Sequence, residues 1–247
     1  MNIYDTWLVN KQIAHRGLHD EVSPENTPSA FEKAINNDYA IEMDLQMTLD
    51  GVVVVFHDDN MKRLTGLDKD IRQTLFKDIK DLSILKSQEK ISTFDDFLKQ
   101  INGRTPLLIE VKSHANIGIM EQKILNYLST YKGEFALQSF NPFIVKWFAI
   151  NAPQYIRGQL SSRFKGERTL NALKRYLLRN LFFIKSNKSQ FVSYDIDGLP
   201  SRLVTRVKKR MPVLAWTVHS QQEITQKHLS FDNIIFENFI PASKQKN

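Results

Sequence analysis

The chain contains no cysteine and no long hydrophobic run. The absence of cysteine excludes disulfide bonds, thiolate metal ligands and a cysteine nucleophile. No apolar stretch reaches the roughly 18 residues that can span a bilayer. The N-terminal residues also lack the basic start and apolar run of a signal peptide. We therefore expect a soluble, cytoplasmic protein.

Acidic residues are fewer than basic ones, 27 against 34, and the basic residues are unevenly spread. Residues 161–190 contain eight Lys or Arg side chains and only Glu167 as an acid. A basic surface can attract nucleic acid, anionic lipid or a phosphorylated substrate. The chain has no known nucleic-acid motif and no aromatics interleaved as in a base-stacking surface. We therefore expect no nucleic-acid partner.

The 247 residues, 42% of them hydrophobic, can bury a substantial core. Strand-like and helix-like stretches alternate, which indicates parallel βα units and an α/β fold. The turn at Leu49–Gly51 joins two of the candidate strands as a hairpin, which reduces nine strands to eight in the main sheet. The candidates are Gln12–His15, Ala40–Leu45, Val52–Phe56, Leu107–Val111, Phe135–Ser139, Arg157–Leu160, Phe191–Tyr194, Val213–Thr217 and Asn233–Phe236.

Two carboxylates lie on one of these candidate strands, in the sequence IEMDL. Because side chains alternate along a strand, Glu42 and Asp44 share a face, roughly 6 to 7 Å apart along the strand. Two buried anions so placed are costly, and a hard divalent cation such as Mg²⁺ or Ca²⁺ would remove that cost. On this pair alone, a solvated face of the sheet is the simpler interpretation.

Two histidines and an arginine change that interpretation. His57 follows the apolar run VVVVF, His15 follows another candidate strand, and Arg16 lies in the turn after it. One histidine at a strand end is usually structural, but two of them beside an arginine and a carboxylate pair favour a functional site. Histidine exchanges protons near neutral pH, and arginine binds phosphate through its planar fork.

Five motifs in this order carry a resemblance to a known family: HRG, PENT, EMD, DGVVVVFHD and LLIEVK. Together they resemble the glycerophosphodiester phosphodiesterase family, and the resemblance extends from Gln12 to Trp216. It implies a metal-dependent hydrolase on a TIM (β/α)8 barrel, with residues 1–247 as a single domain. It also implies that the connection at residues 59–104 is a small insertion over the barrel mouth that shapes substrate choice.

The resemblance implies a third metal ligand on the LLIEVK strand. Glu110 and Lys112 share one face of that strand, so Glu110 joins Glu42 and Asp44 around a divalent cation, Mg²⁺ or Ca²⁺. Lys112 then lies close enough to bind phosphate. The alternative is a surface ion pair between Glu110 and Lys112.

The catalytic residues implied by the resemblance are His15 and His57, with Arg16 on the phosphate. One histidine removes a proton from the nucleophile, and the other supplies one to the leaving alkoxide. Which histidine has which role stays open, as does the choice between direct attack by water and a cyclic phosphate intermediate. The products are glycerol 3-phosphate and an alcohol.

Further residues belong to the expected site with more than one interpretation. Gln138 and Trp216 match family positions near the substrate, although Trp216 taken alone favours the core. Glu25 in PENT either orients the site or braces its loop. The chain departs from the family at Phe236 and Glu237, where a Thr-Asp pair is usual, which puts the contacts of the last strand's loop in doubt.

Residues Arg168–Ile184 predict an amphipathic helix with a basic side. It either covers the barrel or contacts an anionic membrane through residues 168–185. In the second case lysophospholipids become substrates, and the enzyme is a lysophospholipase D acting at the same site. A phosphatidylinositol-type phospholipase C is a weaker alternative, and a non-catalytic phospholipid-binding protein is the alternative from another class. Oligomeric state and headgroup preference stay open.

Overall fold

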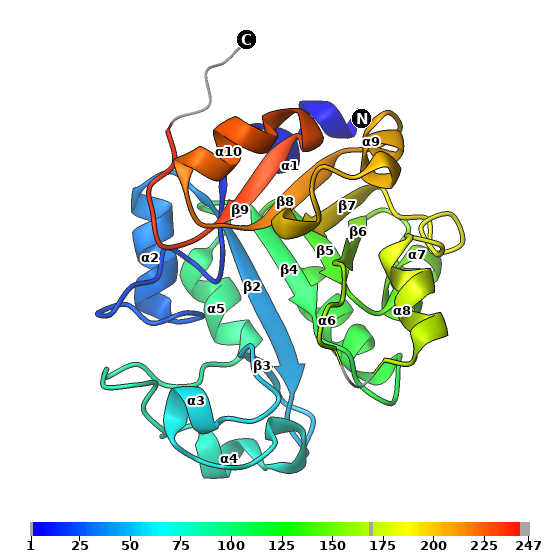
Figure 1. Ribbon diagram of the computed structural model, residues 1–247. Coiled ribbons are helices and arrows are strands. Elements are labelled where there is room, and N and C mark those ends of the chain that lie inside the picture. Colours follow the sequence, from blue (N-terminus) through cyan, green and yellow to red (C-terminus); the bar gives the residue numbers. More distant parts are fainter. Residues whose placement is uncertain (1, 168–169, 243–247) are drawn as a thin grey trace. The chain divides into compact units, whose positions relative to one another are not determined.

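The computed structural model describes residues 2–167 and 170–242, and nine strands lie within these ranges (Figure 1). Each strand predicted from the sequence is present, with small differences at its ends. Their bounds are β1 Ile13–Ala14, β2 Ala40–Met47, β3 Val53–Val55, β4 Leu107–Val111, β5 Phe135–Ser139, β6 Ile156–Ser161, β7 Phe191–Asp195, β8 Val213–Val218 and β9 Asn233–Phe236.

The strand order is that of a closed barrel. The strands are hydrogen-bonded in the order β1-β9-β8-β7-β6-β5-β4-β2-β3, with a further pairing between β1 and β2. Strand β2 pairs with β4 in parallel and with β3 antiparallel, so β2 and β3 form the predicted hairpin. The other eight strands form the parallel sheet of a TIM barrel, which confirms the predicted fold class.

The chain divides into two compact units, Ala14–Phe135 and Met1–Ile13 with Ala136–Asn247. The prediction of one domain over residues 1–247 stays a prediction. In Ala14–Phe135 the helices are α2 Pro28–Asn36, α3 Lys62–Thr65, η2 Ile71–Gln73, α4 Phe76–Ile79, α5 Phe94–Ile101 and α6 Ile119–Leu128. In the other unit they are η1 Ile3–Asp5, α1 Trp7–Asn10, α7 Pro142–Asn151, α8 Ala172–Arg179, η3 Ile196–Gly198, α9 Arg202–Lys208, α10 Gln221–Lys227 and η4 His228–Ser230.

Helix α2 begins at Pro28 and holds the loop before it in place. The Thr27 side chain accepts a hydrogen bond from the Ala30 amide, and Pro28 occupies the first helical position. Gly17 packs against this helix with φ of +81°, and a Cβ there would lie 2.7 Å from the Phe31 ring. Only glycine fits this position, so the turn after β1 is fixed tightly against α2.

The connection at residues 59–104 has a small apolar core of its own. Val54 lies on β3, and Phe56 follows directly after this strand. Both pack with buried residues of the connection, namely Met61, Leu64, Ile71, Ile79, Ile84 and Ile91. Helices α3 and α4 lie beyond the end of β2 in Figure 1. The buried cluster ties this connection to the hairpin, while the prediction that it covers the barrel mouth stays a prediction.

The helix predicted at Arg168–Ile184 is shorter in the structure. Residues 168 and 169 lie outside the described residues, and α8 covers only Ala172–Arg179. Leu181 has φ of +53°, a left-handed conformation that an α-helix cannot contain, so the helix ends before it. Among the described residues, no helix is long and apolar enough to cross a membrane.

Candidate active site

Three buried carboxylates come together on β2 and β4. Glu42 and Asp44 point to the same side of β2, and Asp44 is the direct partner of Glu110 across the parallel pair. Each of the three side chains offers an oxygen within 4.8 Å of the others. All three residues are at most 6% exposed. Glu110 and Lys112 do form an ion pair, but its predicted place on the surface is wrong, because this face of the strands is buried.

The pKa values of the three carboxyls reflect this crowding. Burial raises the pKa of Glu42 well above its usual range, and the charges of Asp44 and Glu110 raise it further. Burial likewise raises the pKa of Glu110. Burial would raise the pKa of Asp44 too, but nearby cations, chiefly Lys112, hold it well below its usual range. The cluster therefore contains more negative charge than its own cations balance.

Lys112 and Arg16 are the cations closest to these carboxylates. The Lys112 ammonium lies 2.7 Å from Asp44 Oδ1 and 2.6 Å from Glu110 Oε1, and these anions raise its pKa despite burial. Arg16 Nε lies 3.2 Å from Asp44 Oδ2, and the Arg16 amide donates a hydrogen bond of 3.0 Å to Glu42 Oε2. Both predicted phosphate-binding residues therefore lie beside the predicted metal ligands.

Both predicted catalytic histidines lie near the same cluster. His15 Nε2 is 4.0 Å from Glu42 Oε2, and the charges of His15 and His57 both lower the pKa of Asp44. His57 Nδ1 is 2.7 Å from Asp58 Oδ1. Burial would raise the pKa of Asp58, but hydrogen bonds from Arg63 and His57 lower it, so this carboxylate is ionised near neutral pH. An ionised Asp58 accepts a hydrogen bond from the Nδ1–H group, which leaves Nε2 to exchange protons.

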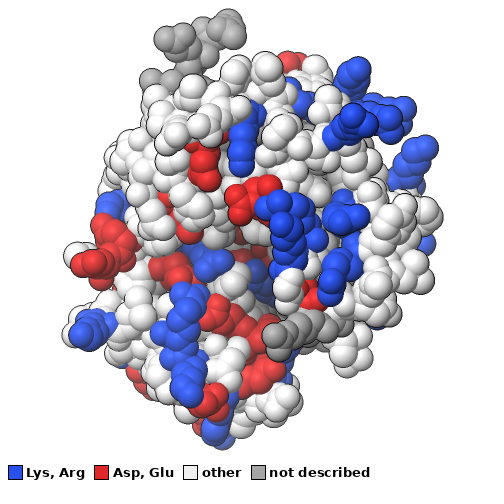
Figure 2. Space-filling model, in the orientation of Figure 1, with Lys and Arg blue, Asp and Glu red and all other residues white. Residues whose placement is uncertain are grey.

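A chain of ion pairs connects His57 to Arg16 through Asp58, Arg63 and Glu25. The sequence did not predict that these residues contact one another. Arg63 on α3 donates from Nε to Asp58 at 2.7 Å and binds both oxygens of Glu25, at 2.7 and 2.8 Å. Glu25 in turn accepts a 2.6 Å hydrogen bond from Arg16. Glu25 therefore holds Arg16 and Arg63 together, while its role in orienting the site stays a prediction. Figure 2 shows Lys and Arg atoms interleaved with Asp and Glu atoms over α3 and α4.

Asn26 is a second residue that the sequence did not identify as part of the site. Its amide donates a 2.9 Å hydrogen bond to Asp44 Oδ2, and its own oxygen accepts from the Asp44 amide at 3.3 Å. Asn26 is buried and has φ of +56°. Asparagine is enriched at such left-handed positions, and its place in the PENT motif was a second signal in the sequence.

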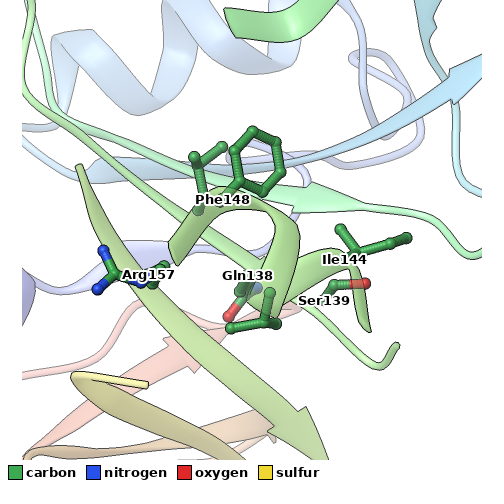
Figure 3. A pocket seen from close by; sticks show the side chains of 7 residues that line it. Gln138, Ser139, Ile144, Phe148 and Arg157 are labelled. Carbon is green, nitrogen blue, oxygen red and sulfur yellow. The ribbon is translucent and has the colours of Figure 1, made fainter. Parts of the chain in front are cut away.

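Gln138 lies on β5, in the unit formed by Met1–Ile13 and Ala136–Asn247, and its side chain is hydrogen-bonded within the protein. Its side-chain oxygen accepts a 2.7 Å hydrogen bond from Ser193. It borders a small hollow with Ile144, Phe148 and Arg157 that has no room for a water molecule (Figure 3). A hollow of this size does not hold a substrate, and the assignment of Gln138 to the substrate stays a prediction.

Trp216 and the residues after β9 also belong to that unit. The Trp216 ring packs edge-on against Phe140 with centroids 5.4 Å apart, and its indole N–H is buried and makes no hydrogen bond to the described residues. Glu237, at the departure from the family pattern, lies 3.5 Å from His219 Nδ1. The substrate contact predicted for Trp216 stays a prediction.

The three carboxylates in Ala14–Phe135 fit a hard divalent cation. Three carboxylates converge in a buried position, and oxygen donors of this kind suit Mg²⁺ or Ca²⁺. Asp44 Oδ1 lies 2.7 Å from the Lys112 ammonium, and a carboxylate oxygen has a second lone pair that a metal could use.

Comparison with known proteins gives consistent matches. Residues 15–239 match the glycerophosphoryl diester phosphodiesterase family. YhdW of Bacillus subtilis is 28% identical over 85% of this chain and 86% of its own length. A lysophospholipase D of Mus musculus is 38% identical, but over only 40% of this chain and 33% of its own length. The solved structure of an Oleispira antarctica phosphodiesterase, in complex with the product sn-glycerol-3-phosphate, has a TM-score of 0.78 at 21% identity and covers 93% of both chains.

Proposed function

Because the chain belongs to the glycerophosphoryl diester phosphodiesterase family and is a phosphoric diester hydrolase, we propose that it hydrolyses glycerophosphodiesters to glycerol 3-phosphate and an alcohol. The observation that carries this proposal is the convergence of three buried carboxylates, Lys112 and Arg16 beside two imidazoles in one compact unit. The product held by the Oleispira antarctica phosphodiesterase is of the proposed class. The full set of candidate groups argues against a non-catalytic phospholipid-binding protein.

Glu42, Asp44 and Glu110 would hold the divalent cation that the family implies. When bound, this cation supplies positive charge for a non-bridging phosphate oxygen. Lys112 and Arg16 lie 2.6 to 3.2 Å from these carboxylates, so they border the same position and would neutralise the remaining phosphate charge there. The bidentate geometry of arginine also orients the phosphate.

His15 and His57 divide the proton transfers. Asp58 holds His57 with its proton on Nδ1, so Nε2 is the atom that accepts or donates a proton at the reacting oxygen. Arg63 and Glu25 keep Asp58 and Arg16 in place and act as positioning residues. His15 serves the other oxygen of the reaction.

Chelation and single substitutions test the proposal. A chelator abolishes release of glycerol 3-phosphate from glycerophosphocholine, and His15→Ala or His57→Ala lowers kcat by roughly 10² or more. His228→Ala removes an exposed histidine of the other unit and is the matched control, expected to keep full activity. Unchanged thermal unfolding in both active-site variants shows that the fold is intact. Full activity in both would refute the assignment.

A lysophospholipase D is the second candidate, and the similarity to the Mus musculus lysophospholipase D favours it. This activity uses the same carboxylates and imidazoles but requires space for an acyl chain. Turnover of glycerophosphocholine and lysophosphatidylcholine, measured side by side with the same preparation, decides between the two. A higher kcat/KM for lysophosphatidylcholine assigns the second function.

A further inference from the structure

Helix α8 exposes large apolar side chains to solvent, although a helix normally buries such side chains. None of its residues is buried, and Leu173 and Tyr176 are 67% and 59% exposed. These two side chains share one side of the helix with Leu177, because positions three and four apart are neighbours. The inward side instead carries Leu178, whose carbonyl accepts from Ser161, and Arg175, which donates to the Glu167 and Leu170 carbonyls.

Two phenylalanines extend this apolar surface beyond the helix. Phe182 is 67% exposed in the turn after α8, and Phe143 is 59% exposed at the start of α7. Phe183 connects them, with ring centroids 5.5 Å from Phe182 and 6.0 Å from Phe143. We name Phe143, Leu173, Tyr176 and Phe182 the apolar patch. Exposed side chains of this size in one region mark an interaction surface.

Basic residues border the apolar patch. Lys174 and Arg179 flank the apolar side of α8, and both are exposed. Lys185 and Lys188 follow in the turn and are exposed as well. Glu167 is the only acidic residue in the sequence between 161 and 190. Figure 2 shows Lys and Arg atoms beside uncharged surface in the region of α8.

We propose that the apolar patch docks onto an anionic phospholipid membrane. Aromatic rings and leucine side chains enter the interface between headgroups and acyl chains, while Lys and Arg reach the lipid phosphates from either side. A second copy of this chain fits the surface less well. A twofold dimer would place the same basic border against itself, and like charges across an interface repel.

Sedimentation with vesicles tests the proposal on the full chain. The protein is expected to bind vesicles of mixed phosphatidylglycerol and phosphatidylcholine at low salt and to remain in solution with phosphatidylcholine alone. High salt weakens binding because it screens the Lys and Arg charges. Neutralising both flanking cations, Lys174→Gln with Arg179→Gln, lowers the partition coefficient more than tenfold, since each contributes roughly fivefold.

Substitutions in the apolar patch separate insertion from general attraction. The double variant Leu173→Ser with Phe182→Ser lowers vesicle binding roughly tenfold or more. Leu229→Ser is the matched control, because Leu229 is 79% exposed in the same unit and outside the apolar patch. All variants keep the thermal unfolding transition of the wild-type protein, which shows that they fold.

Three results would overturn the proposal. The first is failure of the wild-type protein to bind anionic vesicles at low salt. The second is equal loss of vesicle binding in the control and in the apolar patch variant. The third is a dimer, measured by analytical ultracentrifugation, that the Leu173→Ser and Phe182→Ser substitutions dissociate, because this assigns the apolar patch to a second copy. None of these measurements depends on which phosphodiester the enzyme hydrolyses.

Discussion

Asn26 combines a backbone role with a side-chain role at a single position. Its left-handed backbone, with φ of +56°, directs the loop before α2 toward β2. Its amide then makes two hydrogen bonds to Asp44, one with the carboxylate and one with the backbone. A buried carboxylate needs such donors, because losing hydration without replacement is costly. Asn26 therefore fixes the orientation of one proposed metal ligand.

We predict that Asn26→Ala destabilises the protein by about 1 to 3 kcal/mol, because it leaves a buried acceptor without its donor and keeps a left-handed backbone. Asn26→Gly removes the same donor but tolerates the backbone, so it is expected to be the more stable of the two variants. Both variants lower kcat/KM for glycerophosphocholine. Urea unfolding and steady-state kinetics measure these effects, and wild-type activity in Asn26→Gly would contradict the role given to the amide.

At the scale of elements, Arg63 on the short helix α3 forms an ion pair with Asp58, which lies just after β3. Burial would raise the pKa of Asp58 and of Glu25, but hydrogen bonds from Arg63 lower both below their usual values of 3.8 and 4.5. Both carboxyls therefore bind protons more weakly in the folded state than in the unfolded state. The resulting stabilisation is present above about pH 5 and is lost as the pH falls through the lowered folded-state pKa values.

We predict that Arg63→Gln lowers the free energy of unfolding by about 1 kcal/mol near neutral pH, a modest effect because the arginine side chain is half exposed. The difference from the wild-type protein shrinks as the pH falls below about 4, where both carboxyls become protonated. Urea unfolding across this pH range measures it. A difference that stays constant with pH would contradict the assignment of the stabilisation to these ion pairs.

Arg63→Gln is also expected to lower kcat while changing KM little, because a looser Asp58 no longer fixes the proton on His57 Nδ1. We expect a decrease of roughly tenfold, less than for loss of the histidine itself. Lys62→Gln is the matched control on the same helix, since Lys62 pairs with the exposed Asp68 and contacts neither Asp58 nor Glu25. Equal kinetics in the two variants would show that Arg63 has only a structural role.

The sequence predicted strands better than it predicted connections. Alternation and apolar runs depend on neighbouring residues, so the β2–β3 hairpin was predicted. The ion pair between Arg63 and Glu25 joins residues 38 positions apart in the chain, and no local pattern contains it. The helix predicted at Arg168–Ile184 is shorter in the structure for a similar reason, because its periodicity could not reveal the left-handed Leu181.

At the scale of the whole molecule, the carboxylate site determines part of the stability. The resemblance predicted Glu42, Asp44 and Glu110 together, and β2 and β4 place them side by side. Without a metal, Lys112 and Arg16 are two cations among three carboxylates, and burial, with repulsion between the carboxylates, raises the pKa values of Glu42 and Glu110. A divalent cation that binds only the folded state therefore stabilises the entire chain.

We predict that saturating Mg²⁺ or Ca²⁺ raises the Tm by roughly 5 to 10 °C, since a ligand at about a hundred times its Kd adds close to 2.7 kcal/mol to a domain of this size. Glu110→Gln removes one ligand charge and is expected to lose most of this rise. Glu32→Gln changes an exposed carboxylate that pairs with Arg104 and keeps the full rise. Scanning calorimetry with and without metal measures it without any substrate. An equal rise in Glu110→Gln would place the metal elsewhere, because a cation held between β2 and β4 must lose affinity when one of its three buried carboxylates becomes neutral.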